Sequence, residues 1–169
     1  MVDVDVVEFG GADAASEGEP APDFTRPLVN EEYWEDVALS DLLEEGPVLL
    51  VFYTMNGAFP ATYVWNEIRD RSWHEYAAEV VGVSVSDPYA HAKLIEEREI
   101  DHRLFSDPRN EVARKYGVVH DLDGMSGIEE PRPSVFLVDE DRRVAYAWVA
   151  EEWPEFPPYD EIEAELEPP

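Results

Sequence analysis

The sequence of 169 residues contains no cysteine. This absence excludes disulfide bonds, thiolate metal ligands and every mechanism that uses a cysteine nucleophile. The sequence also has no run close to the ~20 apolar residues of a membrane-spanning helix. Its first residues lack the basic region of a signal peptide. We therefore expect a cytoplasmic protein that does not span a membrane.

Positive charge is also scarce. The chain has 12 lysines and arginines against 40 aspartates and glutamates, for a net charge of -28, and its only lysines are Lys93 and Lys115. Such a surface repels nucleic acid and anionic membranes, because both are bound through cationic contacts to phosphates. We expect neither as a partner. An acidic, lysine-poor surface is typical of halophilic proteins that work in molar salt, where the Debye length falls to ~3 Å. We interpret paired glutamates such as Glu129 and Glu130 as part of this surface.

The composition favours a folded globular protein, with 44% hydrophobic and 12% aromatic residues. We predict one domain over residues 20–169. Ahead of it, residues 1–9 alternate weakly, as in an arm or an edge strand, and residues 10–19 are small, polar and acidic. We interpret residues 1–19 as an N-terminal arm and flexible acidic connector.

The most informative stretch is residues 48–71. Residues 48–53 (VLLVFY) form a continuous apolar run, which predicts a central strand covered on both faces. Residues 54–60 follow as a loop, and apolar side chains at helical spacing predict a helix over residues 61–73. A loop between a buried strand and a helix N-terminus is where α/β proteins often place their functional site.

Strand and helix patterns alternate along the rest of the chain. We predict further strands over residues 34–39, 80–86, 104–107, 134–138 and 143–149. Further helices are predicted over residues 41–45, 87–99, 108–116 and 159–166, with Ser40 and Asp87 as N-caps. The order predicts an α/β protein of thioredoxin-like plan, with a central mixed sheet flanked by helices.

Three motifs carry a resemblance to a known family. Residues 20–24 read PAPDF, the apolar run ends in Phe52-Tyr53, and residues 132–139 read RPSVFLVD. In this order and spacing they resemble the peroxiredoxins of the alkyl hydroperoxide reductase/thiol-specific antioxidant type, over residues 19–166. With its acidic surface, the chain resembles a haloarchaeal member of that family. The resemblance implies a thioredoxin-like fold of the peroxiredoxin type, with a C-terminal β-hairpin and helix, and thiol-dependent peroxide reduction.

The family's active site consists of a proline, a threonine, a cysteine and a distant arginine. An alignment without gaps places Thr54 at the proline, Ala58 at the threonine and Ala61 at the cysteine. The arginine position is Arg132. Of the four family residues, this sequence retains the arginine alone.

An alternative alignment sets Pro60 on the proline that often follows the family's cysteine, which places Phe59 at the nucleophile. Peroxide reduction requires a thiolate that attacks the O–O bond. Neither the methyl group of Ala61 nor the phenyl ring of Phe59 can do this. The chemistry that the resemblance implies is therefore missing from the residues.

We interpret the chain as a non-catalytic, peroxiredoxin-like pseudoenzyme that binds a protein partner or a small ligand, without a cofactor. The candidate ligand-binding residues are Arg132, Phe59 and Tyr53, and the candidate partners include a second copy of the chain. Arg132 could bind an anion in the remodelled pocket or pair with a nearby glutamate. Pro133 stands where thioredoxin-like proteins often have a cis-proline, which an X-Pro bond permits. The alternative hypothesis is an antioxidant oxidoreductase whose thiol is supplied by a partner.

The histidines give no strong signal of a metal site. We expect His91, in a helix, and His102, in a charged turn, to lie at the surface. His120, Asp121 and Asp123 could form an oxygen-rich site, but their spacing is shorter than that of a calcium loop. We therefore favour a solvated loop there and predict no metal.

Overall fold

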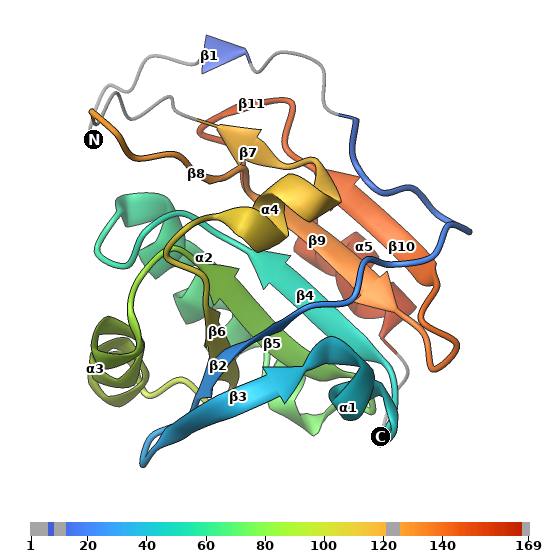
Figure 1. Cartoon of the computed structure of the whole chain (residues 1–169), viewed down its shortest axis with the longest axis horizontal. Coiled ribbons are helices and arrows are strands. Elements are labelled where there is room, and N and C mark those ends of the chain that lie inside the picture. Colours follow the sequence, from blue (N-terminus) through green and yellow to red (C-terminus); the bar gives the residue numbers. More distant parts are fainter. Residues whose placement is uncertain (1–6, 9–12, 121–125, 167–169) are drawn as a thin grey trace.

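The structure, a computed structural model, describes residues 7–8, 13–120 and 126–166 (Figure 1). Its centre is a seven-stranded sheet with the order β10-β9-β4-β5-β6-β2-β3. The strands of this sheet are β2 (Thr25–Val29), β3 (Trp34–Ala38), β4 (Val48–Phe52), β5 (Glu79–Ser84), β6 (Arg103–Ser106), β9 (Ser134–Val138) and β10 (Val144–Val149). Neighbours β4, β5 and β6 run parallel, whereas β9 runs antiparallel to both β4 and β10. The predicted mixed sheet and C-terminal hairpin are confirmed.

Helices cover both faces of this sheet. They are α1 (Leu39–Leu43), α2 (Phe59–Asp70), α3 (Pro88–Arg98), α4 (Glu111–Tyr116) and α5 (Tyr159–Glu165), with a short 3-10 turn η1 at Trp73–Glu75. The core has two clusters, one against α2, α3 and α5 and one against α1 and α4.

Strand β4 explains why the core divides in this way. All of its residues are buried, and successive side chains point to opposite faces of the sheet. Leu49 and Val51 belong to the cluster under α2, whereas Leu50 and Phe52 belong to the other. The prediction of a central strand covered on both faces is therefore confirmed.

The helix starts differ from the sequence prediction for local reasons. Helix α2 begins at Phe59 rather than at residue 61, because Pro60 is well tolerated in a first turn. Helix α1 begins at Leu39, and the carboxylate of Asp41 accepts a hydrogen bond from the Ala38 N–H at 3.3 Å. Ser40 is therefore not the N-cap. Asp87 is the cap of α3 as predicted, since its carboxylate accepts from the Ala90 N–H at 2.8 Å.

The proline-punctuated segment after residue 20 contains a strand that the pattern did not predict. Strand β2 pairs with β3 along its length but with β6 only at Leu28 and Val29. Pro27 has no N–H and is compatible with the strand because it lies outside the ladder with β6. Two short ladders complete the strands. Strand β1 (Val7–Glu8), within the residues where an arm or an edge strand was expected, pairs with the unpredicted β11 (Glu152–Trp153). The ladder of β7 (Val119–His120) with β8 (Glu130–Pro131) was not predicted.

The acidic connector makes several backbone contacts with the domain. The Ala15 N–H donates to the Tyr116 carbonyl at 3.2 Å, and the Gly18 N–H donates to the Val144 carbonyl at 2.8 Å. The boundary at residue 20 stays a prediction. The cis peptide bond found in the described part of the chain precedes Pro154, so the bond before Pro133 is trans. In the same part of the chain, no helix has the length and apolar character needed to cross a membrane.

Candidate functional site

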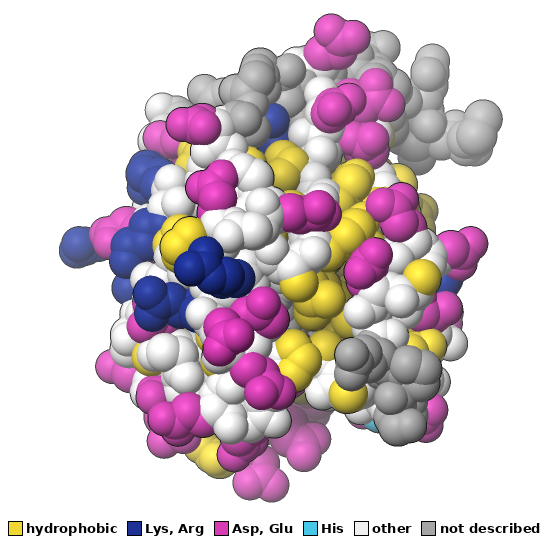
Figure 2. All heavy atoms as spheres, turned by 90° about the vertical axis from the view of Figure 1, so that its right-hand side faces the viewer, with side chains coloured by type: hydrophobic (Ala, Val, Ile, Leu, Met, Phe, Trp, Pro, Cys, Tyr) yellow, Lys and Arg dark blue, Asp and Glu magenta, His cyan; other side chains and the backbone are white. Residues whose placement is uncertain are grey.

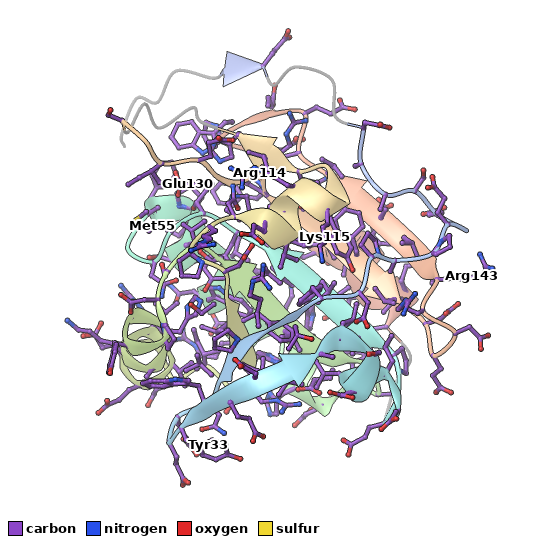
Figure 3. The ribbon with its side chains drawn as sticks, in the orientation of Figure 1. Tyr33, Met55, Arg114, Lys115, Glu130 and Arg143 are labelled. Carbon is purple, nitrogen blue, oxygen red and sulfur yellow. The ribbon has the colours of Figure 1, made fainter. Side chains whose placement is uncertain are left out.

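The loop at residues 54–58 leaves the end of β4 and leads directly into α2. Glu130, from β8, reaches this loop from a distant part of the chain (Figure 3). The Glu130 carboxylate accepts a hydrogen bond from the Met55 backbone N–H at 2.7 Å, and Glu130 is only 1% exposed. The interpretation of Glu130 as acidic surface is therefore wrong. The carboxylate is buried where it holds a backbone N–H of the loop.

Beneath the loop lies a buried histidine, His91, which is fully enclosed. Its Nε2 is 3.0 Å from the Phe105 carbonyl oxygen, which can only accept, so Nε2 carries the proton. Its Nδ1 then accepts from the Tyr53 hydroxyl at 3.2 Å and from the Asn56 side-chain amide at 3.1 Å. The expectation that His91 lies at the surface is wrong, because one helical turn of α3 faces the sheet at this position.

Burial controls the charge of these two rings. It lowers the pKa of His91 to about 4, even though the Phe105 carbonyl and Asp87 act in the opposite direction. Burial also raises the pKa of Tyr53 well above its usual value. Both groups are therefore neutral at pH 7. Through their hydrogen bonds, they connect the loop to α3.

Three serines hold the backbone around the same loop. The Ser84 hydroxyl donates to the Thr54 carbonyl at 3.1 Å, and the Asn56 N–H donates to the Ser86 hydroxyl at 3.0 Å. The Ser106 hydroxyl donates to the Ser86 carbonyl at 2.7 Å. These three serine hydroxyls thus form hydrogen bonds within the chain.

The positions singled out from the sequence lie at the start of α2. Ala58 is the N-cap residue, Phe59 is the first residue of the helix, and Ala61 follows in the first turn. Ala61 is 1% exposed and packs in the core, whereas Phe59 is 38% exposed. The ring of Phe59 contacts that of Trp153, with centroids 5.7 Å apart. The surface above the loop is therefore aromatic.

Arg132 precedes β9 by two residues and is 7% exposed. The backbone N–H of Arg132 donates to the Val118 carbonyl, and the backbone carbonyl of Arg132 accepts from the Ser134 hydroxyl at 2.9 Å. Burial lowers the pKa of its guanidinium group. The arginine is thus held by backbone contacts on both sides, as expected of a residue at the entrance to a central strand.

Residues 18–147 match the AhpC/TSA family along most of the chain. The chain belongs to the AhpC/TSA family. A putative peroxiredoxin of Mycobacterium tuberculosis is 34% identical over 108 residues, which cover 63% of this chain and 69% of that protein. A chloroplastic 2-cysteine peroxiredoxin of Chattonella marina var. antiqua is 28% identical over 141 residues, or 78% of this chain and 69% of the relative.

Solved structures of AhpC/TSA proteins share the fold. The crystal structure of peroxidoxin BcpB from Mycobacterium tuberculosis has a TM-score of 0.69 and 31% identity, and the match covers 81% of this chain and 87% of the other. Enterococcus faecalis AhpC has a TM-score of 0.75 and covers 89% and 90% of the two chains, but at 18% identity it bears on the fold alone. The thioredoxin-like fold of the peroxiredoxin type is therefore confirmed.

This AhpC/TSA protein keeps the fold of its family but has no thiol at either candidate nucleophile position. The sequence has no cysteine at any position. The side chain of Ala61 is a buried methyl group, and the alternative position, Phe59, carries a phenyl ring at the surface. The loss of the nucleophile could be read from the sequence. The buried Glu130 and His91 that now support the loop could not.

The remaining histidines form no metal centre in the described part of this AhpC/TSA chain, where no group of three or more potential ligands gathers. His102 is only 8% exposed, which corrects the expectation of a surface residue. Burial lowers its pKa to about 4, and neighbouring His74 acts in the same direction. His120 is 6% exposed, whereas Asp121 and Asp123, the other members of the considered metal site, lie outside the described residues.

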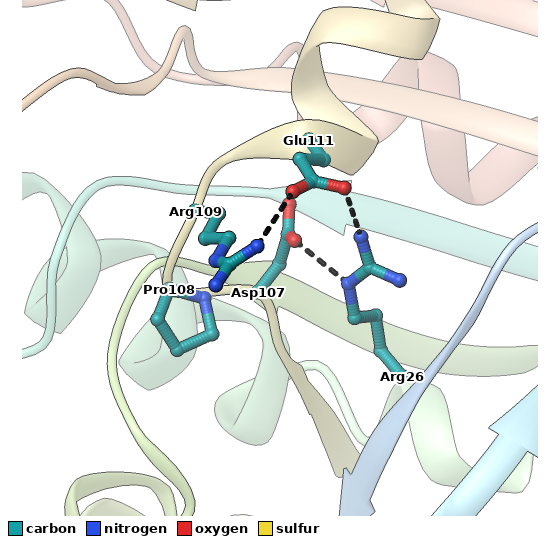
Figure 4. A pocket seen from close by; sticks show the side chains of 5 residues that line it. All are labelled: Arg26, Asp107, Pro108, Arg109 and Glu111. Carbon is teal, nitrogen blue, oxygen red and sulfur yellow. Dashed lines mark hydrogen bonds and ion pairs between the residues drawn. The ribbon is translucent and has the colours of Figure 1, made fainter.

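A separate pocket lies between β2 and the start of α4 (Figure 4). Arg26 lies 3.0 Å from Asp107 and 3.0 Å from Glu111, and Arg109 lies 3.9 Å from Glu111. The second oxygen of Asp107 accepts from the Val112 N–H at 2.8 Å. Two arginines balance two carboxylates here. We interpret this pocket as an ion-pair cluster that joins β2 to α4.

Proposed function

We propose that this protein is a non-catalytic member of the AhpC/TSA family that binds a protein partner or small ligand at its rebuilt loop. The observation that carries the proposal is the buried methyl group of Ala61 in the first turn of α2, where the alignment without gaps places the family's thiol. No other sulfur can take over, because methionine thioethers oxidise slowly and need a separate reductase to be recycled.

The arrangement of the loop supports binding rather than turnover. Its backbone is held by Glu130, Ser84 and Ser86, so it presents a fixed surface. On that surface, Phe59 offers an exposed aromatic ring, and exposed aromatic side chains are typical of protein interfaces. We keep Phe59 and Arg132 as the proposed contact residues. Tyr53, which is 1% exposed and bonded to His91, is buried beneath the loop and is not a contact residue in this proposal.

We propose a second copy of the chain as one of the partners, through the outer edge of β10. This strand lies at the end of the sheet, and an edge strand presents backbone groups that another strand can pair with. The side of the molecule on which it lies carries a band of hydrophobic side chains flanked by acidic ones (Figure 2). The connector occupies part of this edge through Gly18 and Glu19, next to Val144. The part of β10 after Ala147 is the proposed contact.

Two measurements test the proposed function. In a hydrogen peroxide consumption assay with dithiothreitol, we expect the wild-type rate to equal the buffer blank. Turnover above the blank that is abolished by Arg132→Ala would overturn the proposal in favour of an oxidoreductase that uses an external thiol.

For binding, we would compare proteins and small molecules captured in molar KCl by the wild type and by Phe59→Ser. We expect at least one species to be captured by the wild type and lost on the variant, whereas identical captures would contradict the proposed contact. Tyr89→Ser, at an exposed aromatic outside the loop, is the matched control.

For the second copy, sedimentation should give a dimer that Val149→Arg converts to a monomer. A wild-type monomer would exclude this partner.

A further inference from the structure

A pocket of about 370 Å³ lies between α2, α5 and the segment that joins β11 to α5. Its lining does not include the loop at residues 54–58, although the ring of Phe59 lies 6.0 Å from that of Tyr63, centroid to centroid. Its lining residues are Tyr63, Asn66, Glu67, Asp70, Phe156 and Tyr159. The pocket combines aromatic walls with carboxylates, and these two kinds of group together select a particular class of ligand.

The aromatic walls are accessible to solvent. Tyr63 is 58% exposed and Phe156 is 38% exposed. Their ring centroids lie 5.9 Å apart and their planes meet at 71°, so the two rings form a corner. The face of an aromatic ring carries negative electrostatic potential and attracts cations. Two ring faces set at a steep angle can contact one cation from two sides.

The surface around the pocket has an excess of negative charge. The ion pairs on α2 and α5 involve four carboxylates but only two guanidinium groups. The carboxylates are Glu67, Asp70, Asp160 and Glu163, and the guanidinium groups are Arg69 and Arg71. Asp70 and Asp160 are largely exposed, at 65% and 93% of their side chains. A cationic ligand is therefore favoured over an anionic one.

The same surface already binds one organic cation, which belongs to the chain itself. The guanidinium of Arg71 lies 5.4 Å from the centre of the Tyr159 ring and is bonded to Glu67 at 2.7 Å and to Asp160 at 2.8 Å. The hydrogen bonds to Glu67 and Asp160 favour the charged form and raise the pKa of Arg71. The neighbouring corner of Tyr63 and Phe156 offers the same two kinds of contact, one with aromatic rings and one with nearby carboxylates.

We propose that this pocket binds a small organic cation with a quaternary ammonium head, such as a choline-like molecule. Aromatic faces bind such heads through their charge and their apolar surface together. The carboxylates of Glu67 and Asp70 contribute long-range attraction. Molar salt screens that attraction, and inorganic cations stay hydrated, whereas a weakly hydrated quaternary head keeps its contact with the rings. The proposal does not depend on the function proposed for the loop.

The test is a calorimetric titration of the full chain with choline in molar KCl, compared with neohexyl alcohol, in which carbon replaces the charged nitrogen. Choline should bind with a dissociation constant on the order of millimolar and more tightly than the alcohol. Tyr63→Leu or Phe156→Leu should each weaken binding by about 2- to 5-fold, the range expected for the loss of one exposed cation–aromatic contact. Tyr89→Leu, at a 74% exposed ring outside the pocket, should leave binding unchanged.

Three outcomes of the binding titrations would overturn the proposal. The first is no detectable binding of choline, and the second is equal affinity for the alcohol. The third is unchanged choline binding in the Tyr63→Leu, Phe156→Leu double variant, with far-ultraviolet circular dichroism showing that the variant is folded. Chemical-shift changes of aromatic ring protons provide an independent readout. Shifts confined to rings other than those of Tyr63, Phe156 and Tyr159 would place the ligand elsewhere.

Discussion

Ala61→Cys puts a thiol at the position that the alignment without gaps assigns to the family's nucleophile. Because the chain has no cysteine of its own, this thiol is the only one in the variant and its titration can be measured directly. We expect it to have a raised pKa and to be unreactive toward peroxide, even when Ala58→Thr is added. The reason lies in the competition between burial and the helix N-terminus.

The two effects differ in size. The positive end of a helix stabilises a nearby anion by about 0.3–1 kcal/mol, which lowers a pKa by less than about one unit. Burial of an ionisable group shifts its pKa in favour of the neutral form by up to about 3–5 units. Ala61 is 1% exposed, so burial should win and hold the pKa of the thiol above its ordinary ~8.5. The added sulfur also overfills the core, at a cost of about 1–3 kcal/mol.

The assay follows thiolate absorbance in the ultraviolet against pH, together with the rate of reaction with a disulfide reagent and with hydrogen peroxide. Phe59→Cys is the matched control. It lies in the same turn of α2 but is 38% exposed. Its thiol should titrate near the ordinary value or slightly below it and should react quickly with the disulfide reagent.

One result would refute this reasoning: a pKa below 7 for the thiol of Ala61→Cys, accompanied by peroxide reactivity that Arg132→Ala abolishes. It would show that the guanidinium group reaches the thiol and that the catalytic geometry has survived the loss of the cysteine. The loop would then be an intact family site that lacks one atom.

Three further predictions concern stability. In Gly82→Ala the new Cβ would lie 2.5 Å from a ring carbon of Trp65 and 2.6 Å from Leu104, so the free energy of unfolding should fall by about 1–3 kcal/mol and Tm by about 2–10 °C. The substitution Trp65→Phe should destabilise this variant less than it destabilises the wild type. Additive changes in the free energy of unfolding would contradict the overlap between the new Cβ and the Trp65 ring. Because the pKa of His91 is about 4 when folded and 6.5 when unfolded, the unfolded state binds more protons between these values. His91 should therefore lower the free energy of unfolding by up to about 3 kcal/mol as pH drops through that window, in addition to the contribution of His102. Denaturant titrations should show a shallower pH slope in His91→Gln, and an unchanged slope would show that His91 does not cause it. Finally, with a net charge of -28, the midpoint of urea unfolding should rise steeply from low to molar KCl, and a flat response would refute the interpretation of the acidic surface as halophilic.

Most of the fold could be predicted because its signals are local. The apolar run that became β4, the helical spacing that became α2 and the cap at Asp87 each involve residues within a few positions of one another. Strand β2 was missed because its proline suggests irregular chain. Its pairing partners lie in other segments of the sequence, and local pattern does not reveal them.

The support of the site depends on contacts between distant residues. Met55 and Glu130 are 75 positions apart, and Tyr53 and His91 are 38 apart. A glutamate in an acidic chain and a histidine in a charged helix look like surface residues. Their burial depends on which face of the fold they meet, and that is decided only when the sheet is assembled.

The sequence by itself determined that this protein has the family's chain plan and no thiol, because covalent composition cannot be changed by folding. Tertiary structure alone decided that Ala61, one of the two candidate nucleophile positions, is a buried part of the core, since the packing of α2 on the sheet closes it off. It also decided that Tyr63, Phe156 and the carboxylates between α2 and α5 meet in one pocket. Those side chains lie far apart in sequence, and only the packing of the two helices and their connecting segment brings them together.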